Sequence, residues 1–433
     1  MMVRQKTDSG GQGGRRSFPS GRRKIAVILS GGGARGAYEV GVLSYILDSF
    51  ARSRGAAPRF DILCGTSVGA INACLLAAHM ADPTLGIRRL AGLWSDLVLP
   101  DVLGFSLRQA MNLPRVLLGG GSSTVGIFDV SPMAKLIERE IPWRAVARTL
   151  RHGHLSALAI SATEMSSGRT VIFMQTGPDG ALPTTAPPRT IVRGALIGPL
   201  HALASAAIPI LFPPVRIGRE LFMDGGVRQN TPIAPALRLG ATHILAIGLS
   251  REVHGFQHNA EDEKPPGAAF ILGKILNAFL LDHIQTDLEV LTRVNHVIDD
   301  GERAYGSDFL PSINAEAVQR GAPPYRKIKT LVVRPSEDIG RLAAAYVRSH
   351  QLKGGPALAR RIFTFVDVGE ATEADLASYL LFDGAFARKL IELGRADAEA
   401  RRHDIAEFFG SASEDPEPLS SESREWTIPP PVE

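Results

Sequence analysis

The feature that most limits the possible folds is a short apolar run that ends in glycines and is followed by a helical pattern. Residues 24–30 read Lys-Ile-Ala-Val-Ile-Leu-Ser, which is typical of a strand buried on both faces of a parallel sheet. Beyond the glycines, Val40, Leu43 and Leu47 recur at the spacing of one helix face. Residues 60–64 and 68–78 repeat this order of strand and helix, so we expect strands that alternate with helices.

Further strands are predicted along most of the chain. They cover residues 155–163, 170–173, 221–223, 243–248 and 327–333. A helix is expected to begin near Thr231-Pro232 and to end at Gly240. The alternation predicts an α/β fold, a three-layer α/β/α sandwich with a mainly parallel sheet, to which a largely helical C-terminal extension is added.

Length and composition suggest how this fold is divided. The chain has 433 residues, of which 45% are hydrophobic and 21% charged, as in ordinary globular proteins. We expect a disordered basic arm at 1–23, an α/β domain at 24–250, a mixed and largely helical extension at 251–410, and a disordered tail at 411–433. Within the extension, 254–267 is expected to be a linker, 268–284 an apolar helix and 372–408 helical.

Charge and cysteine content limit the classes of partner and the cellular compartments that fit this chain. Two cysteines exclude a disulfide scaffold and fit a reducing compartment. A net charge of +4 is too diffuse to indicate nucleic acid. Residues 1–24 lack the apolar stretch of a secretory signal. The expectation is a cytoplasmic protein, with peripheral contact to a membrane surface possible.

One uncharged stretch, residues 194–215, is long enough to span a bilayer, which takes about 20 residues. Four prolines interrupt it: Pro199, Pro209, Pro213 and Pro214. Each removes a backbone donor where lipid offers no substitute. A buried helix followed by an irregular loop is therefore predicted, and no transmembrane helix.

The first motif with chemical meaning is Gly65-Thr66-Ser67-Val68-Gly69, between a predicted strand and a predicted helix. A serine in this context sits on a tight turn with its hydroxyl at the helix N-terminus. Gly65 and Gly69 leave room for strained backbone and for substrate. The motif is weak when isolated, and its place between strand and helix makes Ser67 a candidate nucleophile.

The second motif is the glycine loop, Ser30-Gly31-Gly32-Gly33-Ala34-Arg35-Gly36, also between strand and helix. Consecutive glycines let several backbone amides point at one anion, either a phosphate or the oxyanion of acyl transfer. The loop also fits a dinucleotide fingerprint, which requires an acidic residue at the end of the next strand. Asp61 lies near the start of that strand, which weakens this alternative.

The third motif is Asp224-Gly225-Gly226, after a predicted strand. In isolation it is more often a turn. Functional loops of parallel α/β sheets gather at the carboxyl ends of the strands, so all three motifs are expected to meet. A hydroxyl, a carboxyl group and backbone donors are the parts that acyl transfer requires.

Together these residues resemble the patatin-like phospholipases, close to the bacterial members, over about residues 24–250. Supporting segments are Gly41-Val42-Leu43, Ser161-Ala162-Thr163-Glu164, and Ala204-Ser205-Ala206-Ala207-Ile208-Pro209 ahead of Phe212-Pro213-Pro214. The resemblance implies a three-layer α/β/α fold and a lipid acyl hydrolase of the phospholipase A or lysophospholipase type. It also implies a catalytic dyad, an acyl-enzyme intermediate, and neither metal nor cofactor.

Carried over by position, Ser67 would be the nucleophile, Asp224 the general base, and the backbone of Gly31, Gly32 and Gly33 the oxyanion hole. The motif-supporting residues would be Arg35, Gly36, Gly65, Gly69, Gly225 and Gly226. Arg35 occupies the family's basic position beside the hole, and it either binds lipid phosphate or braces the loop. The implied substrate is a phospholipid or another acyl-ester lipid, without nucleic acid.

Several alternatives stay open. A histidine base after Asp224 would be His243, His254 or His283, and His201 and His79 are further candidates; the dyad is favoured. His152 and His154 have no partner that suggests a metal. Residues 99–119 fit a lid or ordinary packing. A dinucleotide-binding oxidoreductase, a non-catalytic lipid-binding module and an acyltransferase remain alternative functions.

Overall fold

The computed structural model describes residues 23–104, 126, 128–178, 180–183, 186–251, 273–274, 277, 284–349 and 375–410. The predicted basic arm up to residue 22, the linker at 254–267 and the tail from 411 lie outside these ranges. So do residues 105–119 of the candidate lid and most of the apolar segment 268–284.

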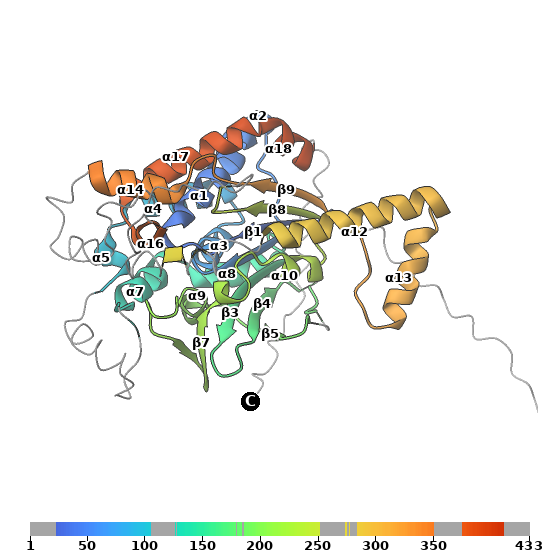
Figure 1. Ribbon diagram of the computed structural model, residues 1–433, viewed down its shortest axis with the longest axis horizontal. Coiled ribbons are helices and arrows are strands. Elements are labelled where there is room, and N and C mark those ends of the chain that lie inside the picture. Colours follow the sequence, from blue (N-terminus) through green and yellow to red (C-terminus); the bar gives the residue numbers. More distant parts are fainter. Residues whose placement is uncertain are drawn as a thin grey trace, which may run out of the picture.

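Nine strands of the described chain form one sheet with helices on both sides (Figure 1). Seven of them follow the order β5-β4-β3-β2-β1-β8-β9, while β7 pairs with β3 and with β6. The strands are β1 (Ile25–Leu29), β2 (Ile62–Thr66), β3 (Ala157–Glu164), β4 (Thr170–Thr176), β5 (Thr190–Gly194), β6 (Val215–Ile217), β7 (Glu220–Asp224), β8 (His243–Ile247) and β9 (Lys329–Val333).

The sheet is mixed but mostly parallel. Strand β1 pairs in parallel with both β2 and β8, and β2 pairs in parallel with β3. The β3–β4 hairpin is antiparallel, as a short connection requires, and β7 pairs with β3 antiparallel. The predicted α/β/α architecture is confirmed, with antiparallel strands added on one side.

The burial of both faces of strand β1 explains why its sequence is apolar throughout. Val27 and Leu29 face one hydrophobic cluster, while Ala26 and Ile28 face another on the opposite side of the sheet. Because successive side chains point to opposite faces, a strand covered on both sides needs apolar residues at every position.

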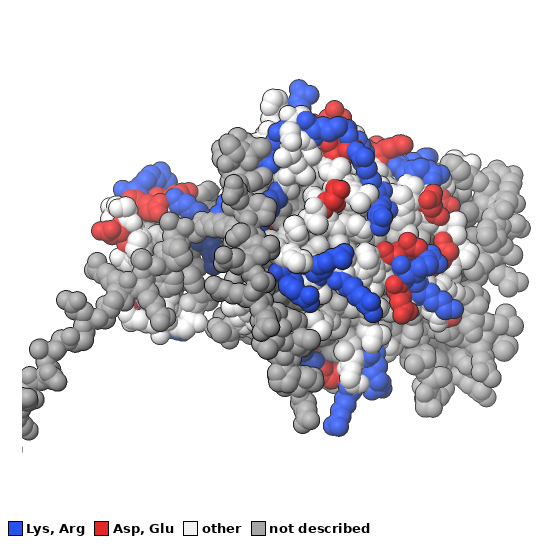
Figure 2. Space-filling model, turned by 180° about the vertical axis from the view of Figure 1, so that it is seen from behind, with Lys and Arg blue, Asp and Glu red and all other residues white. Residues whose placement is uncertain are grey.

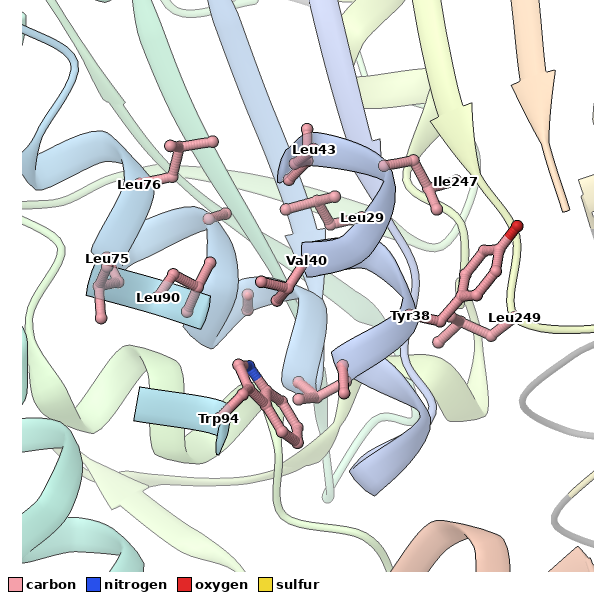
Figure 3. Packing of buried hydrophobic residues seen from close by; sticks show 14 of the residues in the cluster. Leu29, Tyr38, Val40, Leu43, Leu75, Leu76, Leu90, Trp94, Ile247 and Leu249 are labelled. Atoms are coloured by element: carbon pink, nitrogen blue, oxygen red, sulfur yellow. The ribbon is translucent and has the colours of Figure 1, made fainter. Parts of the chain in front are cut away.

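Helices cover both of these faces. The first cluster lies against α1 (Ala37–Ser44), α3 (Val68–Ala78) and α4 (Pro83–Asp96), and the second includes residues of α10 (Ile233–Arg238) and α12 (Ile284–Tyr305). Figure 3 shows Val40 and Leu43 of α1 among Leu29 of the sheet and Leu75, Leu76 and Leu90 of the neighbouring helices. Burial of such side chains contributes about 1.5–3 kcal/mol each.

The remaining described elements lie around this core. They are η1 (Gly33–Gly36), the π-helical turn η2 (Tyr45–Phe50), α2 (Ala51–Arg54), α5 (Leu99–Val102), α7 (Ser131–Glu140), α8 (Trp143–Arg151), α9 (Pro199–Ser205), η3 (Gly225–Val227), α13 (Phe309–Gln319), α14 (Ile339–Ser349), α16 (Asp375–Leu380), α17 (Gly384–Ala400) and α18 (Arg402–Phe409). Helices α12 and α13 project from the body of the molecule (Figure 1).

Residues after 250 contribute to the same sheet and core. Strand β9 pairs in parallel with β8, and Phe408 and Phe409 of α18 are buried in the first cluster. Helices α1 and α17 touch through two glycines: a Cβ on Gly41 would lie 2.2 Å from the Ile391 carbonyl, and one on Gly394 would lie 2.3 Å from that of Tyr38. The boundary at residue 250 stays a prediction, and the packing is continuous across it.

Most predicted elements are found within a few residues of their expected bounds. The helix at 68–78 is α3, and the helix between Thr231 and Gly240 is α10. The uncharged stretch 194–215 contains only the short helix α9, followed by irregular backbone. Among the described residues, no helix is both long and apolar enough for a membrane span. The described part of the predicted helical region 372–408 contains three helices, α16, α17 and α18.

Charged side chains of both signs are exposed on the surface, while a few, among them Arg35, Glu39 and Asp224, are buried. On the face seen in Figure 2, basic and acidic side chains are interspersed rather than separated into two areas. Some neighbouring opposite charges form ion pairs, as Asp48 does with Arg88 at 2.7 Å. Such exposed pairs contribute little to stability, typically below about 1 kcal/mol.

Candidate active site

Ser67 lies at the sharp turn between β2 and α3. Its φ of 54° and ψ of −126° are unusual for a residue with a side chain. Such backbone costs about 1–3 kcal/mol and persists only where the surroundings enforce it. The two motif glycines permit the turn, because a Cβ on Gly65 would lie 2.5 Å from the Gly69 carbonyl and one on Gly69 would lie 2.4 Å from that of Leu29.

A hydrogen-bond relay holds this turn. The Ser67 amide donates to the Ser205 hydroxyl at 2.9 Å, and that hydroxyl donates to the Ser161 carbonyl at 2.6 Å. Ser205 is fully buried at the end of α9. One side chain thus ties the strained turn to β3, the strand beside it.

Asp224 reaches Ser67 because of the sheet register. Strand β2 pairs with β3 as far as Thr66 opposite Ser161, and β7 pairs with the next residue of β3, Ala162, through Asp224. The two strands therefore meet end to end, which brings the carboxyl group of Asp224 to the turn that carries Ser67. Gly225 allows the backbone to pass close to β3, since a Cβ at this position would lie 2.3 Å from the Ser161 carbonyl oxygen.

The electrostatics of Asp224 suit a proton acceptor at neutral pH. Complete burial raises the pKa of this carboxyl group to about 7, although the nearby Ser67 hydroxyl and the Gly226 amide each lower it. Oδ1 accepts the Gly226 amide at 2.7 Å, while Oδ2 is buried without a full hydrogen bond to any described group. The contact with Ser67 is therefore looser than a full hydrogen bond, as is common in sites without substrate.

The glycine loop lies directly against Ser67. A Cβ on Gly31 would lie 3.0 Å from Ser67 Cβ and 2.3 Å from Asn230 Oδ1. Asn230 holds Gly31 on both sides: its carbonyl accepts the Gly31 amide at 3.4 Å, and its Nδ2 donates to the Gly31 carbonyl at 3.1 Å. The amides of Gly32 and Gly33 donate to no group among the described residues.

Buried polar side chains anchor both ends of the glycine loop. Glu39 accepts the Ser30 amide at 2.6 Å and Asn72 Nδ2 at 2.9 Å, and the same Nδ2 donates to the Gly36 carbonyl at 3.2 Å. Trp94 Nε1 donates to Asn72 Oδ1 at 3.0 Å. Burial raises the pKa of Glu39 to about 8 despite the two donors. At Gly36, a Cβ would lie 2.7 Å from Val68 Cγ1, so the loop also packs closely on α3.

The histidines considered as bases lie elsewhere. His201 accepts the Gly198 amide at 3.1 Å at the start of α9, and burial lowers its pKa. His79 contacts the Leu75 carbonyl at the end of α3. His243 pairs with Ile25 at the amino end of the sheet, opposite the site, and burial lowers its pKa to about 4. His254 and His283 lie outside the described residues.

The position of Asp61 does not favour the dinucleotide alternative. Among the described residues, no group of three or more His, Cys, Asp and Glu side chains is arranged to hold a metal, and this includes His152 and His154. Asp61 accepts the Ile25 amide at 2.9 Å and pairs with Arg59. It lies at the amino end of β2, far along the strand from the glycine loop that a dinucleotide would occupy.

Several residues of the site were not singled out from the sequence. Ser205 lies within a segment that supported the family resemblance, yet its bond to Ser67 depends on the packing of α9. Asn230, Glu39 and Asn72 belong to no recognisable sequence motif. Glu39 and Asn72 are single polar residues in the apolar helices α1 and α3, and Asn230 lies in the loop before α10. Arg35 is 3% exposed and contacts α16, more than 300 residues later in the chain.

A family model and a curated relative that match this chain are both described as phospholipases. A family model described as patatin-like phospholipase matches residues 27–237. The cGAMP-activated phospholipase of Pseudomonas aeruginosa is 29% identical over 206 residues, which cover 48% of this chain and 53% of that protein. The chain thus spans about half the length of this curated relative.

Solved structures show a more distant likeness. VipD of Legionella pneumophila is 14% identical, with a TM-score of 0.28 over 88% of this chain and 93% of VipD. In the ExoU–SpcU complex of Pseudomonas aeruginosa, the similar chain is 18% identical, with a TM-score of 0.24 over 89% of this chain and 76% of that one.

The match to the family model includes all three motifs that meet in this structure. Ser67, Asp224 and the whole glycine loop fall within residues 27–237. Residues 27–237 of this chain are therefore identified as a patatin-like phospholipase region.

Proposed function

We propose that this protein hydrolyses acyl esters of lipids, with Ser67 as nucleophile, Asp224 as general base and the glycine loop as oxyanion hole. The observation that carries the proposal is the position of Ser67, which lies at a strained turn between the Asp224 carboxyl group and Gly31. A hydroxyl, a proton acceptor and unpaired amides around one point are the parts of a serine hydrolase.

In the first step, Ser67 Oγ attacks the ester carbonyl carbon while its proton moves to Asp224. A pKa of about 7 leaves a large fraction of Asp224 ionised at neutral pH, yet makes it a stronger base than an ordinary carboxylate. The tetrahedral oxyanion is then held by backbone amides, each worth about 3 kcal/mol in known hydrolases. Gly32 and Gly33 are the best donors, because their amides are unpaired among the described residues, whereas that of Gly31 already donates to Asn230.

In the second step, the alcohol leaves and takes the proton from Asp224, so that an acyl ester of Ser67 remains. Water then attacks this ester as Asp224 accepts its proton, and Asp224 returns that proton to Ser67 Oγ as the fatty acid is released. The dyad needs no histidine, because one carboxyl group performs every proton transfer. An alcohol in place of water would make the same site an acyltransferase.

The substrate class follows from the family rather than from a bound ligand. The match of residues 27–237 to the patatin-like phospholipases and the name of the Pseudomonas relative both support a phospholipid or another acyl-ester lipid. A lipid substrate also implies contact with a membrane surface during turnover.

Covalent labelling tests the proposal most directly. A fluorophosphonate probe should modify the wild-type protein, and peptide mass spectrometry should locate the adduct on Ser67. Ser67→Ala should abolish labelling and the hydrolysis of p-nitrophenyl butyrate, and Asp224→Asn should abolish hydrolysis, while both remain folded by circular dichroism. Turnover retained in either variant would overturn the assigned roles.

The lipid assignment needs a separate measurement. Fatty-acid release from phosphatidylcholine, lysophosphatidylcholine and triolein, each presented in detergent micelles, should be detectable for at least one of them and absent in Ser67→Ala. A protein that binds such micelles without reacting with the probe would instead be a non-catalytic lipid-binding module.

A further inference from the structure

We infer that helix α16, in the C-terminal part of the chain, positions the oxyanion hole through Arg35, and that Arg35 is a positioning residue rather than a ligand for lipid phosphate. This inference rests on the proposed function of the glycine loop. It concerns three residues of α16, which we call the α16 contact set: Asp375, Ser378 and Tyr379.

The guanidinium of Arg35 is turned toward α16. Its Nε donates to Ser378 Oγ at 2.7 Å, and its Nη2 lies 3.1 Å from Asp375 Oδ1. Its carbon Cζ lies over the Tyr379 ring, 4.5 Å from the centroid. Only 3% of Arg35 is exposed. A lipid headgroup could therefore bind the guanidinium only by displacing these contacts.

The backbone of the glycine loop also abuts α16. Gly33 has a φ of +57°, and a Cβ there would lie 2.3 Å from the Tyr379 carbonyl oxygen. The orientation of the Gly33 amide is therefore set by a neighbour that comes from the far end of the sequence. Since Arg35 follows Gly33 by two residues, the side-chain and backbone contacts hold the same turn.

Helix α16 is itself well held. Ser378 Oγ donates to the Asp375 carbonyl at 2.6 Å, and Tyr379 Oη donates to Asn277 Oδ1 at 2.9 Å. Lys274 Nζ lies 3.0 Å from Asp375 Oδ2. Leu376 and Leu380 are buried in the first hydrophobic cluster. A helix anchored in this way is a rigid support for the loop.

The chemistry of arginine suits this role. A planar guanidinium presents donors in a fixed fork and stacks on an aromatic ring, whereas lysine offers a single flexible charge. Lysine at position 35 would keep the charge near Asp375 but lose the bond to Ser378. Arg35→Lys therefore separates geometry from charge.

The loop acts only when negative charge develops on the substrate, so its misplacement should lower kcat and leave KM nearly unchanged. We expect Arg35→Lys, Asp375→Asn and Ser378→Ala each to reduce kcat for p-nitrophenyl butyrate by about 10- to 100-fold, within the range known for lost oxyanion donors. Arg35→Lys combined with Ser378→Ala should cost little more than either alone, because both changes remove the same bond.

Arg395→Ala is the matched control. Arg395 also links the C-terminal part to the N-terminal part, because its Nη2 donates to Ser49 Oγ at 3.0 Å, yet it lies on α17 away from the glycine loop. This variant should retain wild-type kcat. Asp375→Glu, which preserves the charge, should recover part of the activity lost in Asp375→Asn.

Hydrogen exchange provides a readout that does not depend on activity. Peptides covering residues 30–37 should exchange faster in Asp375→Asn and Ser378→Ala than in wild type or in Arg395→Ala, with thermal unfolding measured in parallel. If the wild-type protein neither hydrolyses esters nor reacts with a fluorophosphonate, the proposed function fails, and exchange of these peptides still decides whether α16 positions the loop.

Two results would overturn the inference. One is unchanged kcat and unchanged exchange of residues 30–37 in all three variants. The other is an Arg35→Lys variant with normal kcat on p-nitrophenyl butyrate but a raised KM for phosphatidylcholine micelles, which is the signature of a phosphate ligand.

Discussion

Thr66 and Asp224 pair with consecutive residues of strand β3, Ser161 and Ala162, so strands β2 and β7 end against each other on one side of β3. One strand carries the candidate nucleophile just past its end, and the other ends on the candidate base. The distance between the two groups is therefore set by a backbone ladder rather than by flexible loops. A site built on strands in this way is held more tightly than one built on loops alone.

The pKa of Asp224 predicts how activity depends on pH. Burial raises this pKa to about 7, and only the ionised carboxylate accepts a proton from Ser67. We therefore expect kcat/KM for p-nitrophenyl butyrate to rise about tenfold per pH unit below 7 and to level off above about pH 8. An ordinary carboxylate would instead give a flat profile from pH 5 to 8, which would contradict the environment described for Asp224.

The same burial predicts that Asp224 lowers the stability of the fold at neutral and alkaline pH. Its pKa is higher in the folded than in the unfolded state, so the folded state binds the proton more tightly, and the free energy of unfolding falls as pH rises from about 4 to about 7. Asp224→Asn removes this ionisation and should be more stable than wild type at pH 8 by an amount on the order of 2–4 kcal/mol.

Urea unfolding at pH 5 and pH 8 measures this difference. At pH 5 the difference should be smaller than at pH 8, because Asp224 is then still mostly protonated in the folded protein although it has already lost its proton in the unfolded state. Ser67→Ala, which keeps the carboxyl group, serves as the control for loss of activity alone. Equal stability of Asp224→Asn and wild type at both pH values would argue against a strongly buried carboxylate.

Ser205 should affect both stability and rate. Its hydroxyl accepts a hydrogen bond from the Ser67 amide and donates one to the Ser161 carbonyl, so Ser205→Ala removes two buried hydrogen bonds. We expect a loss of about 1–3 kcal/mol in unfolding free energy and a clear fall in kcat as the Ser67 turn relaxes.

The control for Ser205 is another buried hydroxyl far from the site. Thr149 donates to the Ala77 carbonyl at 2.7 Å, at the other end of α3. Thr149→Val should lose comparable stability yet keep kcat. Similar kcat values for the two variants would show that Ser205 does not position Ser67.

Gly33→Ala should be far more damaging than an alanine at another glycine with positive φ. Gly33 (φ +57°) faces the Tyr379 carbonyl, whereas a Cβ on Gly55 (φ +84°) would meet no atom within 4 Å beyond its chain neighbours among the described residues. Gly55→Ala should cost only the backbone strain of a left-handed residue, about 1–2 kcal/mol.

Thermal unfolding and ester hydrolysis of the two variants distinguish the cost of backbone strain, which both share, from the clash with Tyr379, which only Gly33→Ala introduces. Gly33→Ala should be the less stable of the pair and should lose most activity, because the loop must move away from Tyr379. A pair of equally stable and equally active variants would mean that the glycine loop adapts without cost.

Much of the site could be predicted from residues that are close together in the sequence. The strand-to-helix context of Ser67 and of the glycine loop is local, and so is the turn at Asp224. The meeting of Ser67 with the glycine loop follows from the general geometry of parallel sheets. By contrast, β7 runs antiparallel to β3. No pattern within residues 220–224 indicates that β7 pairs with β3 directly beyond the end of β2.

The supports of the site were harder to predict. Glu39, Asn72 and Ser205 are single polar residues within apolar segments, and their partners come from other helices. The role of Arg35 stayed open for the same reason. Its position in the motif is local, but the atoms that bind it belong to α16.

The alternation of strands and helices, and the chemical groups at the strand ends, can be predicted from local patterns, because periodicity and glycine placement act over a few residues. Three properties depend on the folded chain instead: β7 abuts β2, burial raises the pKa of Asp224, and α16 contacts the glycine loop. Those properties arise from contacts between distant segments, whose strength depends on distance and desolvation that no local pattern records.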